Sequence, residues 1–170
     1  SSEMTANNWE VEKYLEAKAT EENVKSVDNP AILHIATHGV FREDVSVTAN
    51  QGDFANEGKA LANPLLRSML YFAGVENSDK STTNDGKLTA FEAMDLNLEG
   101  TDLVVLSACE TGLGEVKNGE GVYGLQRSFQ VAGTKALVMS LWTVSDDATQ
   151  LLMTKFYDYL IHGDDKRTSF

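Results

Sequence analysis

Three short apolar runs constrain the fold of this chain more than any other feature of its sequence. They read AILHIAT (residues 31–37), LVVLSA (103–108) and ALVMSLW (136–142). Each run has the length of a strand rather than of a helix, and each contains β-branched or aromatic residues. Runs that are apolar throughout are typical of strands buried on both faces, as in a parallel sheet. The sequence therefore predicts a sheet built around these three segments.

The segment between the second and third runs predicts a helix. It reads GVYGLQRSFQVAG (121–133), and Gly133 is a natural residue to end such a helix. Apolar side chains recur in it at helical spacing, namely Val122, Leu125, Phe129 and Ala132. A strand, a helix and a strand in this short distance form a βαβ unit, whose two strands pair in parallel. The predicted class is α/β.

Other segments carry weaker signals. We expect short helices after the capping residues Thr20 and Thr89, a long helix after Ser145, and a hairpin formed by SMLYFAG (68–74) and KLTA (87–90). The stretch WEVEKYLEA (9–17) predicts at most one strand, and the polar stretch 45–64 predicts a long loop.

Charge and composition exclude several functions. The 170 residues carry a net charge of −12, which disfavours direct binding of nucleic acid, because that needs a basic face. No stretch approaches the ~18 continuous apolar residues of a membrane span, so we expect no membrane association. The single cysteine cannot form an internal disulfide and gives no sign of an oxidising compartment, so we expect a cytoplasmic protein.

Candidate catalytic residues follow two of the apolar runs. His38 and Gly39 come directly after the first run, and Cys109 comes directly after the second. The carboxyl ends of parallel strands meet at one edge of a sheet, where ligands bind, so imidazole and thiol are expected to emerge together. A nearby histidine favours the reactive thiolate and can protonate a leaving amine. The N–H groups of Gly39 and Cys109 are candidates for stabilising an oxyanion.

Each of these residues also has an ordinary structural interpretation. A lone cysteine after an apolar run is commonly a plain buried thiol, and a lone histidine is commonly structural. His34 lies four residues before His38, on the same face of the strand but deep in the run. We therefore interpret His34 as a core histidine or as one that supports the site.

Three other chemistries fit the sequence less well. The glycines from Gly112 to Gly124 resemble a phosphate-binding loop but lack the GxxxxGK[ST] pattern, so we expect a flexible loop over the site. His34 and His38 would lie ~13 Å apart along a strand, too far to share a metal. Asp146 and Asp147 can form an acid/base pair, but aspartates at the start of a helix are common because of the helix dipole.

Several motifs together resemble the CHAT domain, a caspase-like peptidase domain related to separases and gingipains. The resemblance is carried by ILHIATHGVF (32–41), DGKLTAFEAMDL (85–96) and the long stretch from LVVLSACETGLG to the end of MTKFYDYL (103–160). It covers most of the chain, from about Thr20 to His162. It implies a caspase-like, three-layer α/β/α fold with a mostly parallel central sheet, and residues 1–170 would form one such domain.

The resemblance also assigns roles. It implies a cysteine endopeptidase in which His38 is the general acid/base and Cys109 is the nucleophile, with Gly39 and Cys109 forming the oxyanion hole. The aspartate of the separase LWxVxD segment lies in the pocket for the residue before the cut. That position corresponds to Asp146, with Asp147 as a possible substitute. The resemblance implies that the domain needs no cofactor and no metal ion.

The resemblance extends to partners. CHAT domains often follow tetratricopeptide repeats in bacterial proteins, which implies a regulatory repeat region or partner and a protein substrate. The family's first strand and helix have no counterpart here, so we expect a fragment of a larger protein with one sheet position open. Two other interpretations remain: a non-catalytic CHAT-like module that binds a peptide in the same cleft, and a nucleotide-binding α/β domain built on the glycines after Cys109.

Overall fold

The computed structural model describes residues 9–41, 64–77, 84–110, 120–140, 145–163 and 169. The chain divides into two compact units, which are described separately. One comprises residues 16–143 and contains the sheet, and the other comprises residues 1–15 together with 144–170. The predicted loop at 45–64 lies outside the described residues except for Pro64, which begins a helix.

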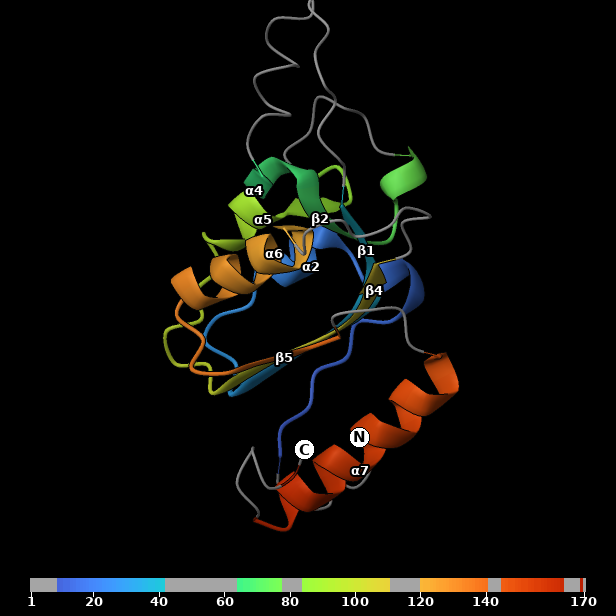
Figure 1. Cartoon of the computed structure of the whole chain (residues 1–170), viewed down its shortest axis with the longest axis vertical. Helices are drawn as coiled ribbons and strands as arrows, with labels where there is room; N and C mark the ends of the chain where they lie inside the picture. The colour runs from blue at the N-terminus through green and yellow to red at the C-terminus, as the bar shows by residue number, and fades with distance from the viewer. Residues whose placement is uncertain are drawn as a thin grey trace, which may run out of the picture. The chain divides into compact units, whose positions relative to one another are not determined.

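A five-stranded sheet forms the centre of the larger unit (Figure 1). Its order is β3–β2–β1–β4–β5, with bounds β1 (Ile32–Phe41), β2 (Ser68–Tyr71), β3 (Lys87–Thr89), β4 (Leu103–Glu110) and β5 (Leu137–Met139). β1, β4 and β5 pair in parallel, β2 is antiparallel to β1, and β3 is antiparallel to β2. Four strands therefore share one direction, and the predicted strands, hairpin and mostly parallel sheet are confirmed.

The helices form largely where their sequence signals predict them. They are η1 (Glu16–Lys18), α2 (Glu21–Lys25), α4 (Pro64–Arg67), η2 (Val75–Asn77), α5 (Ala90–Ala93), α6 (Glu120–Val131) and, in the smaller unit, α7 (Asp146–Ile161). The predicted capping bonds are present: the side chains of Thr20, Thr89 and Ser145 each accept a hydrogen bond from the first turn of the following helix. After α6, Gly133 has a φ of 109°, a backbone conformation that glycine adopts without strain.

The stretch of residues 9–17, for which the sequence predicts at most one strand, forms none. Residues 9–15 have no regular secondary structure, and the short helix η1 begins at Glu16, whose φ is 51°. Residues 12–18 are exposed, so alternating apolar and polar residues find no buried surface to pack against. A strand needs neighbouring strands and a packed face, which an alternating pattern alone does not supply.

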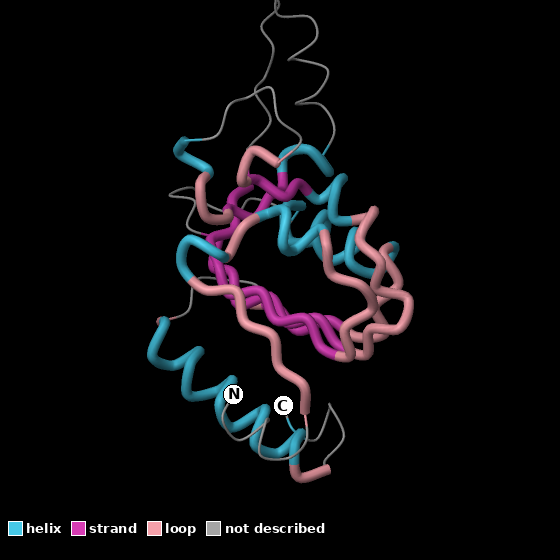
Figure 2. Tube along the Cα trace, turned by 180° about the vertical axis from the view of Figure 1, so that it is seen from behind, coloured by secondary structure: helices cyan, strands magenta, loops and turns pink. Residues whose placement is uncertain are grey.

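The hydrophobic core lies on one face of the sheet, beneath α4, α5 and α6 (Figures 1 and 2). Ile35 on β1 and Val104 and Leu106 on β4 belong to this core, as does Phe129 of α6. Because side chains alternate along a strand, the neighbouring residues of β1 and β4 lie on the other face. The helical layer predicted for that face stays a prediction.

One side of β1 is only partly paired. β2 pairs with His38 to Phe41, and among the described residues no strand pairs with residues 32–37 on the side away from β4. Among the described strands, the first half of β1 therefore pairs with β4 alone. That a further strand occupies the other side of β1 stays a prediction.

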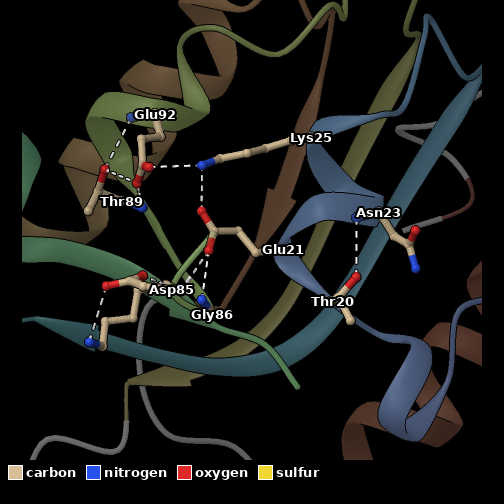
Figure 3. Close-up of polar contacts among 9 residues, drawn as sticks. Thr20, Glu21, Asn23, Lys25, Asp85, Gly86, Thr89 and Glu92 are labelled. Carbon is tan, nitrogen blue, oxygen red and sulfur yellow. Dashed lines mark hydrogen bonds and ion pairs between the residues drawn. The ribbon is translucent and has the colours of Figure 1, made fainter. Parts of the chain in front are cut away.

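Glu21, the first residue of α2, is a buried carboxylate that ties this helix to the connection between β2 and β3 (Figure 3). It accepts hydrogen bonds from the backbone N–H of Gly86 at 2.7 Å and of Lys87 at 3.1 Å, and it pairs with Lys25 Nζ at 2.5 Å. These partners offset the high cost of burying a charge. Gly86 has a φ of 79°, and a Cβ there would lie 2.6 Å from the Cα of Val75, so the turn requires glycine.

Thr89 and Glu92 form a capping box at the start of α5, and Lys25 joins it from α2 (Figure 3). Thr89 N–H donates to Glu92 Oε2 at 2.9 Å, Glu92 N–H donates to Thr89 Oγ1 at 3.2 Å, and Lys25 Nζ lies 2.9 Å from Glu92 Oε1. Partial burial raises the pKa of Glu92, but the hydrogen bonds from Thr89 and the Lys25 ammonium outweigh it and hold the pKa below its usual value.

We expect Glu92→Gln to lower the free energy of unfolding by about 1 kcal/mol near pH 7, the usual cost of weakening a helix cap. Folding lowers the pKa of Glu92, so its ionised form stabilises the fold above the unfolded pKa, and this stability is lost as pH falls through the folded pKa. Urea unfolding should therefore show that the difference in free energy of unfolding between the wild-type chain and Glu92→Gln shrinks near pH 3. Glu76→Gln, at an exposed position of η2, is the control and should change little. A deficit of equal size near pH 3 would contradict the ionic contribution.

Candidate active site

The candidate catalytic residues lie opposite each other on two neighbouring parallel strands. β1 and β4 pair in one continuous register, from Ile32 opposite Leu103 to Gly39 opposite Glu110. In this register His38 is the direct partner of Cys109. Neighbouring strands lie about 4.8 Å apart, so the two backbone positions are within the span that an imidazole and a thiol can bridge.

The prediction that the first strand ends before His38 is wrong, because β1 continues to Phe41. The antiparallel strand β2 pairs with His38–Phe41 and so keeps these residues extended. The Thr37 hydroxyl also donates a hydrogen bond to the backbone carbonyl of Tyr71 on β2. Cys109 is likewise inside β4, one residue before its end. The parallel ladder of β1 and β4 nevertheless stops at the next pair, so both residues still lie at its carboxyl end.

His38 and Gly39 differ in their surroundings. The His38 side chain is exposed, and Gly39 is buried between register partners on both sides, Leu70 on β2 and Glu110 on β4. Backbone N–H groups in a strand point sideways toward neighbouring strands. The oxyanion role of Gly39 and Cys109 stays a prediction, as do the catalytic roles of His38 and Cys109.

The interpretation of His34 as a core histidine is wrong, and the alternative, that it supports the site, stays a prediction. Its side chain is exposed, and by alternation with the buried Ile35 it lies on the face opposite the core. Its Nε2 is 3.0 Å from the Oγ of Ser107 on β4, within hydrogen-bond distance. Neighbouring protein atoms still desolvate the imidazole, and this lowers the pKa of His34 below its ordinary value.

Ser107 is a polar residue near the site that our sequence analysis did not single out. It lies two residues before Cys109 on β4, a spacing that places both positions on one face of the strand. A serine within an otherwise apolar run was the available signal, because a buried strand gives a hydroxyl few polar partners.

Asp146 and Asp147 begin α7 in the smaller unit. Ser145, not an aspartate, makes the observed capping bond, accepting from Ala148 N–H at 3.2 Å. Asp147 is exposed. The assignment of both aspartates to a specificity pocket stays a prediction.

The flexible loop predicted from Gly112 to Gly124 does not extend to Gly124, because its last residues are helical. Residues 111–119 lie outside the described residues, but α6 begins at Glu120, so Gly121 and Gly124 are helical. Among the described residues, no group of three histidine, cysteine or acidic side chains is arranged to hold a metal ion. Within the same part of the chain, no helix combines the length and apolarity needed to cross a membrane.

The mostly parallel sheet, the helices packed on its core and the register at its centre define a caspase-like α/β domain. The chain belongs to the CHAT domain family, which matches residues 3–169. It is similar to tetratricopeptide repeat protein 28 from Mus musculus, with 32% identity over 154 residues, and from Homo sapiens, with 29% identity over 154 residues. Each alignment covers 85% of this chain but only 6% of the relative, and no solved structure matches.

The lowered pKa of His34 predicts a pH-dependent stability. The unfolded chain takes up a proton at His34 at a higher pH than the folded chain does. The contribution of His34 to the free energy of unfolding is therefore fully present above the ordinary histidine pKa of about 6.5, and it is lost as pH falls toward the folded pKa. We expect His34→Gln to flatten the fall of Tm between about pH 6.5 and pH 5, measured by scanning calorimetry. His162→Gln, at the exposed end of α7, is the control. An unchanged slope in His34→Gln would contradict the assignment.

Proposed function

We propose that this CHAT domain is a cysteine endopeptidase that cleaves a protein partner. The observation that supports the proposal most directly is the register of β1 and β4, which sets His38 opposite Cys109 at the end of the parallel ladder. The family match supports it as well, because CHAT domains are related to cysteine peptidases.

The proposed reaction uses only these two side chains and water. The Cys109 thiolate adds to the carbonyl carbon of the scissile peptide, and the N–H groups of Gly39 and Cys109 stabilise the resulting oxyanion. The His38 imidazolium then gives its proton to the amine as the carbon–nitrogen bond breaks, leaving a thioester on Cys109. Water, deprotonated by His38, hydrolyses the thioester and restores the thiol.

We further propose that a tetratricopeptide-repeat region controls the domain. Both relatives are named tetratricopeptide repeat proteins, and this chain corresponds to only 6% of either. Such repeats form extended concave surfaces suited to binding a protein, which could deliver a substrate or a regulator to the catalytic domain. The absence of a basic surplus, at a net charge of −12, favours a protein over a nucleic acid as the partner. We also propose that the domain acts in the cytoplasm, because its single cysteine cannot form the internal disulfide typical of an oxidising compartment.

Cys109→Ala should abolish cleavage, because no other side chain can supply a thiolate in a chain with one cysteine. His38→Ala should lower kcat by at least about 100-fold, the lower end of what general acid/base catalysis contributes. The measurement uses the full chain and a fluorogenic peptide library, together with a biotinylated peptidyl acyloxymethyl ketone that alkylates active-site thiolates. His162→Ala is the matched histidine control and should keep wild-type rates.

The outcomes separate the two functional classes. Labelling and cleavage that both depend on Cys109 and His38 support the peptidase. Retained cleavage in Cys109→Ala would refute it. Peptide binding without labelling or cleavage in the wild-type chain would instead support the non-catalytic CHAT-like module.

We also propose that Asp146 selects a basic residue before the cut. It is the first residue of α7 and follows β5 in the sequence. The carboxyl end of β5 points the same way as those of β1 and β4, because the three strands are parallel. A carboxylate in the pocket would favour lysine or arginine through a charge-assisted contact, and Asp147 is the substitute candidate.

Asp146→Asn should reduce kcat/KM for substrates with lysine or arginine before the cut by about 10- to 100-fold and leave apolar substrates nearly unchanged. Peptides that vary at this one position measure the preference. Asp147→Asn tests the substitute candidate, and Asp158→Asn, at an exposed position in the last turn of α7, is the control. A uniform loss across the library would assign Asp146 a structural role. Indifference of the wild-type chain to a basic residue would end the proposal.

A further inference from the structure

A side-chain hydrogen bond joins the two strands that carry the candidate dyad. The Nε2 of His34 on β1 lies 3.0 Å from the Oγ of Ser107 on β4. The bond is diagonal across the ladder, because the register partner of His34 is Val105 and that of Ser107 is Ala36. It therefore resists sliding of one strand along the other as well as their separation.

The bond is close to the candidate dyad. The pair Ala36–Ser107 lies two positions before the pair His38–Cys109 in the same register, which is about 7 Å along the strands. Two positions along a strand restore the same face, so residues 34, 36 and 38 of β1 share a face, as do residues 107 and 109 of β4. The bond and the dyad positions thus occupy the same side of the same two strands.

The first part of β1 pairs with a described strand on one side, and the Thr37 hydroxyl joins it to β2 by donating to the Tyr71 carbonyl. Among the described strands, β4 alone pairs with residues 32–37, because β2 begins its pairing with β1 only at His38. A register shift of one residue would turn every side chain of β1 to the opposite face and remove His38 from Cys109. Burial of Ile35 on the far face opposes this shift, and a bond between side chains on the dyad face adds to that opposition.

We propose that His34 and Ser107 form a positioning pair that holds β1 and β4 in the register that the dyad requires. The proposal rests on the proposed function, since it presupposes that His38 and Cys109 work together. Neither residue needs to touch the substrate. Desolvation disfavours the protonated imidazole and lowers the pKa of His34, which is consistent with a role as a hydrogen-bonding group rather than as a charged one.

Alkylation of Cys109 measures the dyad without any substrate. The chain has one cysteine, so the rate of iodoacetamide modification reports Cys109 alone. A thiolate paired with the His38 imidazolium reacts well below the ordinary thiol pKa of about 8.5, and a cysteine without that pairing does not. The rate is measured on the full chain from pH 5 to 10, at a temperature where every variant is folded by circular dichroism.

Two variants remove the bond in different ways. His34→Phe, a good strand former, and Ser107→Ala should each lower the rate near pH 7 by about tenfold and move the midpoint of the pH profile upward toward about 8.5. His34→Gln keeps a hydrogen-bonding group and should retain most of the wild-type rate. His162→Phe and Ser26→Ala, at exposed helix ends outside β1 and β4, are the controls. If cleavage is observed, kcat should fall while KM stays nearly constant.

The results distinguish this proposal from the proposed function. In one outcome, the pH profile of Cys109 alkylation has a low midpoint that rises in His38→Ala but not in folded His34→Phe or Ser107→Ala. This outcome would overturn the positioning pair and leave the dyad intact. A midpoint near about 8.5 in the wild-type chain, unaffected by His38→Ala, would overturn the dyad and with it the pair. A loss in His34→Phe that His34→Gln restores, with Tm unchanged in both, supports positioning over a purely structural role.

Discussion

The candidate site depends on the parallel pairing of β1 with β4 in a single register. That register places His38 opposite Cys109 and directs Ile35 and Leu106 into the same core. Because side chains alternate along a strand, a slip of one residue would expose the core residues and separate the dyad positions together. Packing on one face therefore fixes chemistry on the other, and the bond between His34 and Ser107 acts on the second face directly.

The rest of the larger unit supports these two strands. β2 keeps the end of β1 extended, and β2 and β3 are in turn fixed to α2 by the buried carboxylate of Glu21. Lys25 links that carboxylate to the capping box of α5 (Figure 3). A network of this kind is costly to break, because removing one partner leaves a buried charge without compensation. The network therefore helps to hold β2 and β3 where β2 can pair with the end of β1.

The sequence by itself determined where most strands and helices form and that the central strands pair in parallel. The three apolar runs contain β5 and most of β1 and β4, the helical period between Val122 and Ala132 lies within and just after α6, and the capping threonines start α2 and α5 where predicted. These features depend on local chemistry: apolar periodicity, capping hydroxyls and glycine at a left-handed turn. The short βαβ connection also requires β4 and β5 to pair in parallel. His38 and Cys109 each follow an apolar run directly, which places both near the carboxyl end of the ladder between β1 and β4.

Only the tertiary structure decided how far the strands extend and which face each residue occupies. Residues 38–41 remain in β1 because β2, distant in sequence, pairs with them, whereas residues 9–15 form no strand despite their alternating pattern. The apolar neighbours of His34 in the sequence predict a core position, yet alternation with Ile35 turns this histidine outward toward Ser107. Alternation is visible in a sequence, but the face that becomes the core is chosen by the helices that pack there.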